Sequence, residues 1–337
     1  MNNIEIIILS ILMIFLNLIF TKYNIFVDKI HTSRHKQFIV KKNIIPITGG
    51  IYLILGYLIT DAYIFNFKEF YYLFIIFFLG YLSDTIKNFL PIHRLIFQGT
   101  ICLLFLLYFE VKITDVRIEA FNNLLNYILV SYLFSLFCIL VLMNGSNFMD
   151  GINLLSIGYF ILILISVLFL SKNNGLLINI DLVQNLLIML SFLFFMNMFN
   201  KIYLGDNGIY LLSFIVAILL IKFYSDNNVV SPYYIISLLW YPCFENLFSI
   251  IRKRIKKIDP QTPDNLHLHH LLYKKLSKIK SSLIRNNLTG FIILFFNIPI
   301  FLMNTFYYNH TKIIIFLIFT SVAFYLISYF FLKKSQN

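Results

Sequence analysis

Charged residues are scarce in this sequence: Asp, Glu, Lys and Arg make up only 12% of its 337 residues. A soluble domain carries roughly 25% charged residues, whereas 60% of the residues here are hydrophobic. Apolar runs recur along the whole chain, and the longest polar stretch extends only from about Arg252 to Asn287. The composition therefore argues against a separate soluble domain and predicts one integral membrane domain over residues 1–337.

Cysteine is also rare, and its three residues all fall within apolar runs. They are Cys102, Cys138 and Cys243. Three scattered cysteines indicate neither a disulfide framework nor a metal site, because cysteine in an apolar run behaves as a small hydrophobic residue.

Eleven apolar runs are candidates for membrane spans, because a helix crosses roughly 30 Å of hydrocarbon in about 20 residues. They lie at 4–20, 44–60, 64–82, 94–109, 124–143, 154–170, 181–198, 208–224, 232–250, 288–304 and 312–332. The first run lacks a preceding Lys or Arg and a small-residue cleavage site, so we expect a retained span and not a cleaved signal. The predicted fold is all-α: a polytopic transmembrane helical bundle with about eleven spans, or ten.

The net charge of +12 points to a nucleic-acid partner only until the charges are placed. With eleven spans, 21 of the 27 Lys and Arg residues fall on one face and six on the other. Basic residues concentrate on the cytoplasmic side of membrane proteins. We therefore expect an outside N-terminus, a cytoplasmic C-terminus, a cytoplasmic basic and histidine-containing loop at 251–287, contacts with membrane lipid and no nucleic-acid partner.

Three aspartates differ from the other acidic residues, because each follows the cytoplasmic end of an apolar run in a different loop. They are Asp84, Asp150 and Asp206. A carboxylate at membrane depth costs roughly 2.5–3.5 kcal/mol on insertion scales, so its presence requires a reason. Three carboxylates on one face suit Mg²⁺, which uses one or two of them and keeps positions for water and phosphate oxygens. The alternative for each is a polar cap or an interfacial turn.

The long cytoplasmic loop contains a cluster of histidines, His267, His269 and His270. Asp264 is expected to cap a short helix that carries them. Imidazoles among Lys and Arg residues suit an anionic phosphate. The alternatives are a zinc site, although no cysteine is near, and an ordinary interfacial helix.

Two residues near the ninth apolar run add to this loop. Arg252 is the member of a basic run that lies nearest the membrane; such a run otherwise fixes topology or contacts anionic lipid headgroups. Glu245 lies within the span and is expected to be paired inside the bundle, with a basic residue as the partner.

Taken in order, five motifs resemble those of the polyprenyl-phosphate N-acetylhexosamine-1-phosphate transferase family. They are Pro46-Ile-Thr-Gly-Gly50, Gly80-Tyr-Leu-Ser-Asp84 followed by Lys87 and Arg94-Leu-Ile-Phe-Gln98, Asn144 to Asn153, Gly205-Asp206-Asn-Gly208, and His267-Leu-His-His270. The likeness covers about residues 28–272, and the ordered set is specific although each motif alone is weak. Within this glycosyltransferase family 4 type, the chain looks like the UDP-GlcNAc:undecaprenyl-phosphate GlcNAc-1-phosphate transferase branch.

The resemblance implies an enzyme that transfers N-acetylhexosamine-1-phosphate from a UDP-N-acetylhexosamine to polyprenyl (undecaprenyl) phosphate, releasing UMP. This step starts a cell-envelope polysaccharide such as lipopolysaccharide, in a multi-pass protein of the bacterial inner membrane whose active site faces the cytoplasm. It implies Mg²⁺, or Mn²⁺, bound by Asp206 and Asp84, and a catalytic set of Asp84, Asp150 and Asp206. The implied substrate-binding residues are Lys87, Asn144, Asn147, Gly151, Asn153, Arg252, His267, His269 and His270. A homodimer is left open.

Two departures from the family pattern keep alternatives open. The family commonly has two adjacent aspartates where this chain has Ser83-Asp84, and Asn153 replaces the second aspartate of the Asp-Gly motif. If the missing carboxylate is indispensable, the chain is a catalytically silent homologue. The other alternative is a membrane transporter, whose acidic residues should lie near the membrane midplane in related halves. Here they lie at one face, and no internal repeat is evident.

Overall fold

The computed structural model describes residues 2–28, 45–86, 89–259, 262 and 264–335. Within these ranges the regular structure is helical, apart from one isolated bridge between Val27 and Pro46. In chain order the helices are α1 (Asn2–Tyr23), α2 (Gly49–Thr60), α3 (Glu69–Thr85), α4 (Pro91–Tyr108), α5 (Glu119–Leu125), α6 (Ile128–Met149), α7 (Leu155–Asn174), α8 (Ile180–Met198), α9 (Gly205–Asp226), α10 (Pro232–Leu238), α11 (Trp240–Ile255), α12 (Leu268–Lys275), the 3₁₀ helix η2 (Leu276–Lys278), α13 (Ser282–Phe306) and α14 (Thr311–Lys334). The prediction of an all-α bundle is confirmed.

Every predicted span overlaps with helix, although the run at 232–250 forms two helices, α10 and α11, and fewer helices than predicted are long and apolar enough to cross a membrane. By length and composition, eight helices of the described chain meet that condition, or nine if α10 and α11 form one span bent by 73°. The runs at 44–60 and 64–82 form shorter helices, α2 with 12 residues and α3 with 17. The structure thus supports a multi-pass membrane protein, while the number of spans and the side of each terminus stay predictions.

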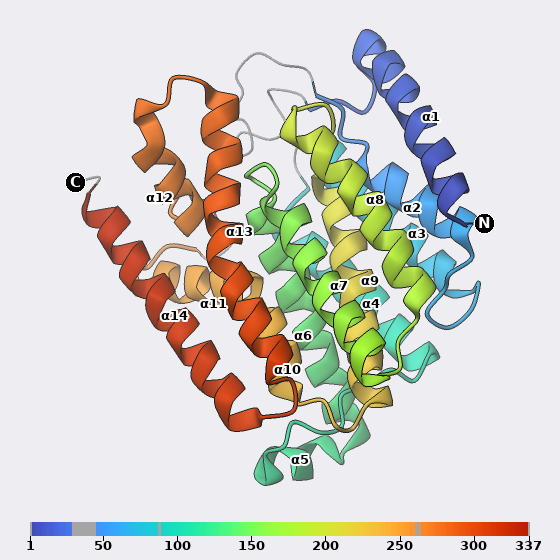
Figure 1. Ribbon diagram of the computed structural model, residues 1–337, viewed down its shortest axis with the longest axis vertical. Coiled ribbons are helices and arrows are strands. Elements are labelled where there is room, and N and C mark those ends of the chain that lie inside the picture. Colours follow the sequence, from blue (N-terminus) through green and yellow to red (C-terminus); the bar gives the residue numbers. More distant parts are fainter. Residues whose placement is uncertain (1, 29–44, 87–88, 260–261, 263, 336–337) are drawn as a thin grey trace.

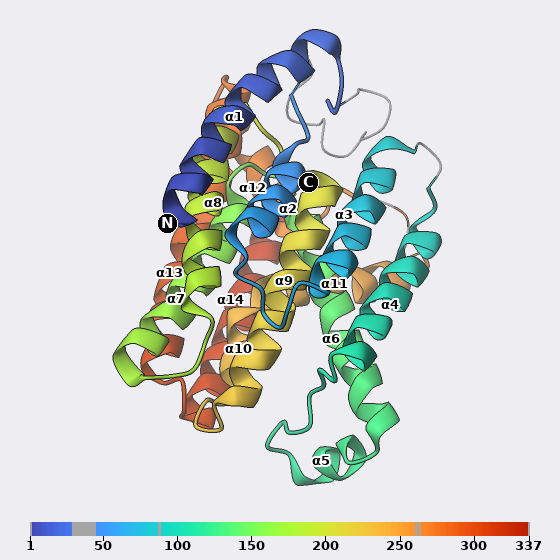
Figure 2. The ribbon, with the colours of Figure 1, turned by 90° about the vertical axis from the view of Figure 1, so that its right-hand side faces the viewer.

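Helix α9 is the centre of the bundle. Every residue from Gly205 to Ile221 is buried, which is typical of a helix that is apolar on all sides. Helices α2, α3 and α6 pack around it, and Figures 1 and 2 show α9 in yellow between them. The N-terminus of α9 is therefore fixed by neighbours on several sides.

The bundle has two distinct ends. Figure 1 shows α5 at one end and, towards the other, α12 and the C-terminus. The end of α3 and the start of α4 also lie away from α5 (Figure 2). Because α6 starts next to α5, its last turn, with Met149, points towards the α12 end. The residues predicted to carry chemistry come from this second end of the bundle.

Candidate functional site

Asp84 caps the N-terminus of α9. Its Oδ1 accepts a hydrogen bond from the backbone N–H of Asp206 at 3.1 Å, and its Oδ2 accepts from the backbone N–H of Asn207 at 3.1 Å. The Asn207 side chain donates a third bond to Oδ2 at 2.7 Å. The first N–H groups of a helix have no partner within the helix, and a carboxylate is stabilised there. Asp84 thus joins the end of α3 to the start of α9.

Asp206 lies in the first turn of α9 and gathers side chains from three other positions. Its Oδ2 accepts from the Ser83 hydroxyl at 2.6 Å and from Arg94 Nη1 at 3.3 Å. Arg94 also donates to Ser83 Oγ at 3.0 Å. The Tyr210 hydroxyl, one turn further along α9, lies 3.5 Å from the same carboxylate oxygen. A buried carboxylate (Asp206), a cation (Arg94) and two hydroxyls (Ser83 and Tyr210) thus meet where α3, α4 and α9 converge. We call this group the first cluster.

Helix α6 completes this cluster from the fourth side. Asn147 Nδ2 donates to the Tyr210 hydroxyl at 3.4 Å, while its Oδ1 is buried without a hydrogen-bond partner. Asn144, one turn earlier, donates to Gln98 Oε1 at 3.4 Å, and Gln98 Nε2 is likewise buried and without a partner. Buried polar atoms are normally paired. The unpaired atoms of Asn147 and Gln98 therefore fit a site that is completed by water or ligand.

Two glycines allow the close approach that builds the cluster. A Cβ on Gly80 of α3 would lie 2.4 Å from Cα of Asn207 and 2.5 Å from the carbonyl oxygen of Asp206. Gly205 has a φ of +71°, in the left-handed region that favours glycine, and a Cβ there would lie 2.9 Å from Asp84 Oδ2. Only glycine at both places lets α9 start directly against the end of α3.

The Asp-Gly motif after α6 contacts α7, the histidine segment and α8. Asp150 Oδ1 accepts from the Ser156 hydroxyl at 2.9 Å. A Cβ on Gly151 would lie 3.4 Å from His270 Nε2, so this glycine borders the histidine segment. Asn153 is buried in a cluster of amides, where its Nδ2 contacts the Asn200 side chain at 2.6 Å and the Asn197 carbonyl at 3.1 Å. Its side chain links α8 to the motif, so a contact with substrate stays a prediction.

The histidine segment, which carries His267, His269 and His270, is held by contacts that differ from those predicted from the sequence. Asp264 was expected to cap the short helix, but His267 occupies the N-cap position of α12, without a side-chain cap bond. Asp264 instead binds Arg252, whose Nη2 lies 2.9 and 2.7 Å from its two carboxylate oxygens. Arg252 Nη1 also donates to the Leu266 carbonyl at 2.7 Å. Arg252 therefore folds the loop, and its predicted substrate contact is untested.

Burial and charge act in opposite directions on Asp264. Burial alone would raise the pKa of its carboxyl, but the bonds from the Arg252 guanidinium and the nearby His267 hold that pKa below its usual value. Asp264 is therefore ionised near neutral pH. The carboxylate remains available to hold Arg252 in place.

Glu245 was expected to pair with a basic residue inside the bundle. It is fully buried, and its Oε1 shares a hydrogen bond of 2.7 Å with His267 Nδ1. Its Oε2 accepts from the Tyr325 hydroxyl at 2.6 Å. Among the described residues the basic partner is therefore a histidine, placed 22 positions later in the loop.

His269 and His270 extend from His267 towards α6. The rings of His267 and His269 are stacked, with centroids 5.4 Å apart and an interplanar angle of 6°. The His269 and His270 centroids are 4.4 Å apart, and the Phe148 ring of α6 lies 4.9 Å from His267. The last turn of α6 thus lies between the first cluster and the histidines and contacts both. Asn147 contacts the first cluster, and Phe148 contacts His267.

Burial lowers the pKa of His269 well below its usual 6.5, and the neighbouring His270 and His267 lower it further. The folded protein thus binds fewer protons at His269 than the unfolded chain does. The free energy of unfolding is therefore not reduced by this group above pH 6.5, and below that pH it falls by up to about 1.4 kcal/mol per pH unit. We expect amide hydrogen exchange in α12, corrected for its intrinsic rate, to be about tenfold faster at pH 5.5 than at pH 7.5. His269→Leu should lose most of this dependence; an unchanged dependence would contradict it.

The comparison with protein-family models covers the part of the chain that carries the first cluster. The family model described as Glycosyl transferase family 4 matches residues 68–224. The matched segment is slightly less than half of the chain, and the likeness to this family extends over that segment. A Bacillus subtilis protein named "Probable undecaprenyl-phosphate N-acetylglucosaminyl 1-phosphate transferase" is 31% identical over 166 residues, 48% of this chain and 46% of that protein. A Thermotoga maritima "Undecaprenyl-phosphate alpha-N-acetylglucosaminyl 1-phosphate transferase" is 30% identical over 84 residues, 25% of this chain and 28% of that protein.

The matches span less than half the length of these relatives. The family 4 segment includes Ser83, Arg94, Asp150 and Asp206, whereas the histidine segment lies beyond its end. The structure brings the two together through α6. Lys87, another predicted site residue, lies outside the described residues.

The first cluster has oxygen ligands that suit a hydrated Mg²⁺, although it offers few of them. No group of three or more His, Cys, Asp or Glu side chains in the described part of the chain is arranged to hold a metal. Asp84 and Asp206 each accept three hydrogen bonds, but those to Asp84 come from the start of α9 and make it a cap, so Asp206 is the carboxylate that fits a metal better. The open amide oxygen of Asn147, whose Nδ2 donates to Tyr210, is a second candidate oxygen ligand. One carboxylate with water and phosphate oxygens is sufficient for Mg²⁺.

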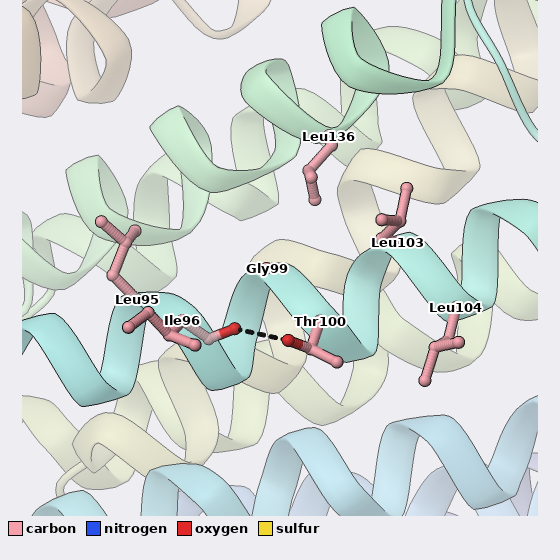
Figure 3. Close-up of a pocket in the computed structure, with 7 residues that line it drawn as sticks. All are labelled: Leu95, Ile96, Gly99, Thr100, Leu103, Leu104 and Leu136. Carbon is pink, nitrogen blue, oxygen red and sulfur yellow. Dashed lines mark hydrogen bonds between the residues drawn. The ribbon is translucent and has the colours of Figure 1, made fainter. Parts of the chain in front are cut away.

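An apolar groove begins beside this cluster on the outer face of α4. It has a volume of about 370 Å³ and lies between α4 and Leu136 of α6 (Figure 3). Leu95 and Gly99 in its wall directly follow Arg94 and Gln98 in the sequence. The other residues that line it are Ile96, Thr100, Leu103 and Leu104. A polar cluster and an apolar groove thus use opposite faces of one helix.

Proposed function

We propose that the chain transfers N-acetylglucosamine-1-phosphate, or a related N-acetylhexosamine-1-phosphate, from a UDP-sugar to undecaprenyl phosphate. The observation that carries this is the contact of Asp206 with Ser83, Arg94 and Tyr210, together with the unpaired amide oxygen of Asn147, whose Nδ2 donates to Tyr210. The names of the matching relatives support the acceptor and the sugar. The reaction would start a cell-envelope polysaccharide at the cytoplasmic face of the bacterial inner membrane.

The reaction is a phosphoryl transfer between two anions. An oxygen of the lipid phosphate forms a bond to the sugar-bound phosphorus of the UDP-sugar, and the bond from that phosphorus to the bridging oxygen breaks. The bridging oxygen leaves with UMP, so no water is consumed. A phosphate monoester loses its second proton near pH ~6 and is already a nucleophile at neutral pH. The site needs to neutralise and align charge more than it needs a general base.

Arg94 is the cation best placed for this task among the described residues of the first cluster. It is paired with Asp206 by a single 3.3 Å contact and its side chain is 27% exposed. A guanidinium has five N–H donors in a fork that fits phosphate oxygens. Arg94 therefore binds a phosphate while it keeps a contact with the cluster. Asn144, which contacts Gln98, would orient the donor, together with Asp150 and with His270, whose Nε2 borders Gly151.

Mg²⁺ would be held by Asp206 and Asn147 and would supply positive charge to the diphosphate; Mn²⁺ uses similar oxygen ligands. Asp84 keeps Asp206 in position by capping α9. The Ser83 hydroxyl occupies the place where relatives of the resembled family commonly have an aspartate, and it donates to Asp206. The nucleophile needs little help from a general base, so the reaction need not depend on this missing carboxylate. The residues that neutralise charge, Arg94 and Asp206, are still present.

The apolar groove on α4 suits the polyprenyl chain of the acceptor. Its wall residues place aliphatic side chains within one or two positions of Arg94 and Gln98. A lipid phosphate bound by Arg94 then has its chain on the apolar face of the same helix. This arrangement favours a lipid acceptor over a soluble one.

A transporter is the function from another class, and it is less well supported. Its ionisable residues should lie near the membrane midplane. Asp84, Asp150 and Asp206 lie at or just beyond the ends of α3, α6 and α9. The silent homologue remains the alternative that an assay must address.

We expect the purified full-length chain with Mg²⁺, undecaprenyl phosphate and UDP-GlcNAc to release UMP. A panel with UDP-GalNAc and UDP-glucose identifies the sugar, and EDTA should abolish release until Mg²⁺ or Mn²⁺ is restored. UMP release is measured by liquid chromatography, with protein heated beforehand as the control. Tight UDP-sugar binding without release from any sugar would show a silent homologue.

A further inference from the structure

The last helix of the chain reaches the histidine segment through a buried carboxylate. Glu245 on α11 is fully buried, and both of its oxygens are paired, one with His267 and one with the Tyr325 hydroxyl of α14. A carboxylate removed from water is stable only when its oxygens have such partners. Figure 1 shows α14, in red, beside α11 and α12. Tyr325 is therefore one of two groups that hold Glu245 in place.

The histidine segment depends on these contacts because it has little structure of its own. Residues 264–267 form no helix, and α12 has only eight residues. A helix of this length does not persist without tertiary contacts. Arg252 holds the Leu266 carbonyl on one side, and Glu245 holds the His267 ring on the other. The direction in which α12 starts is set at these two points.

The contacts continue from His267 to the motif that carries Asp150. His267 stacks on His269, which lies against His270. His270 Nε2 in turn borders Gly151, directly after Asp150. A displacement of His267 is thus transmitted over two ring contacts to Gly151, next to Asp150.

We infer that Tyr325 is a positioning residue for the phosphoryl transfer: its hydroxyl fixes Glu245, which orients His267 and, through α12, His270. The inference rests on the proposed function. It gives α14 a role at the site in addition to its role as a membrane span. Phe248 supports the arrangement, since its ring packs on those of Tyr325 and Tyr329 at 5.7 and 5.0 Å.

Helix α14 offers a matched pair of substitutions. Tyr325 and Tyr329 lie one turn apart, are both 1% exposed and have parallel rings. The Tyr329 hydroxyl lies 3.4 Å from Arg252 Nη1, but Arg252 keeps its shorter bonds to Asp264 and Leu266. Tyr325→Phe and Tyr329→Phe remove the same atom and leave the packing. Only the first leaves a buried carboxylate oxygen without its donor.

We expect Tyr325→Phe to lower kcat about tenfold or more, as misplacement of a reacting group does, while the KM for undecaprenyl phosphate stays unchanged. Amide hydrogen exchange in residues 266–273 should accelerate in this variant and not in Tyr329→Phe. Equal kcat and equal exchange in both variants and the wild type would overturn the inference. So would a loss of kcat that only matches a loss of protein able to bind UMP.

A wild-type protein that releases no UMP would refute the proposed function without deciding this inference. In that case the exchange measurement decides the positioning contact, because it needs no turnover. Faster exchange in Tyr325→Phe alone supports the contact, and identical exchange in the two variants overturns it.

Discussion

Asp206→Asn should reduce UMP release by about 10³-fold, the upper range for removal of one charge-stabilising group from a phosphoryl or acyl transfer site. The amide has the same shape, so Ser83 and Arg94 keep a hydrogen-bond acceptor. What is lost is the negative charge that balances Arg94 and that would hold a hydrated Mg²⁺. The rate with saturating substrates, measured over a range of Mg²⁺ concentrations, should fall and should need more metal to recover.

Asp226→Asn on the same helix is the matched control. Asp226 ends α9, and its carboxylate lies 3.3 Å from Lys222 in a partly exposed pair at i and i+4. Such pairs contribute little to stability, roughly 0–1 kcal/mol. The control should therefore keep full activity and an unchanged melting temperature. Full activity in Asp206→Asn would refute the metal and charge assignment made for the first cluster.

The sequence predicted that Asp84 and Asp206 lie close together, because both stand in motifs at helix ends. Asp84 and Asp206 were expected on one face in different loops, and the structure joins them through the N-terminus of α9. Tyr210 was not predicted, because a tyrosine within an apolar run usually belongs to the core. The signal was its spacing: Tyr210 follows Asp206 by four residues, as Gln98 follows Arg94, and this places each pair on one helix face.

The histidine segment was harder to predict because its partners are distant in the sequence. Glu245, His267 and Tyr325 are separated by 22 and 58 positions, and only the packing of α14 against α11 and α12 brings them together. The local pattern favoured Asp264 as a cap, but its carboxylate pairs with Arg252, whose Nη2 contacts both of its oxygens. The number of helices long enough to span is lower than predicted because of packing as well. Helix α2 is buried by its neighbours, and a helix that is covered by protein need not have the full apolar length.

Gly80→Ala should have the largest effect on the fold of the site. The new methyl group would lie 2.4–2.5 Å from backbone atoms of Asp206 and Asn207, which cannot move aside as a flexible side chain can. Overpacking of this kind costs about 1–3 kcal/mol, and the strain falls on the first turn of α9. We expect a lower melting temperature in detergent and a loss of most UMP release.

Ile75→Ala is the control for this prediction, because it changes an exposed residue of the same helix, 46% accessible. It should leave both measurements unchanged. The strain in Gly80→Ala can relax only by separating α3 from α9, which breaks the bonds from Asp84 to the start of α9. Activity should therefore fall further than the melting temperature implies. A Gly80→Ala protein as active as the control would mean that Asp84 and Asp206 need not be held together for the reaction.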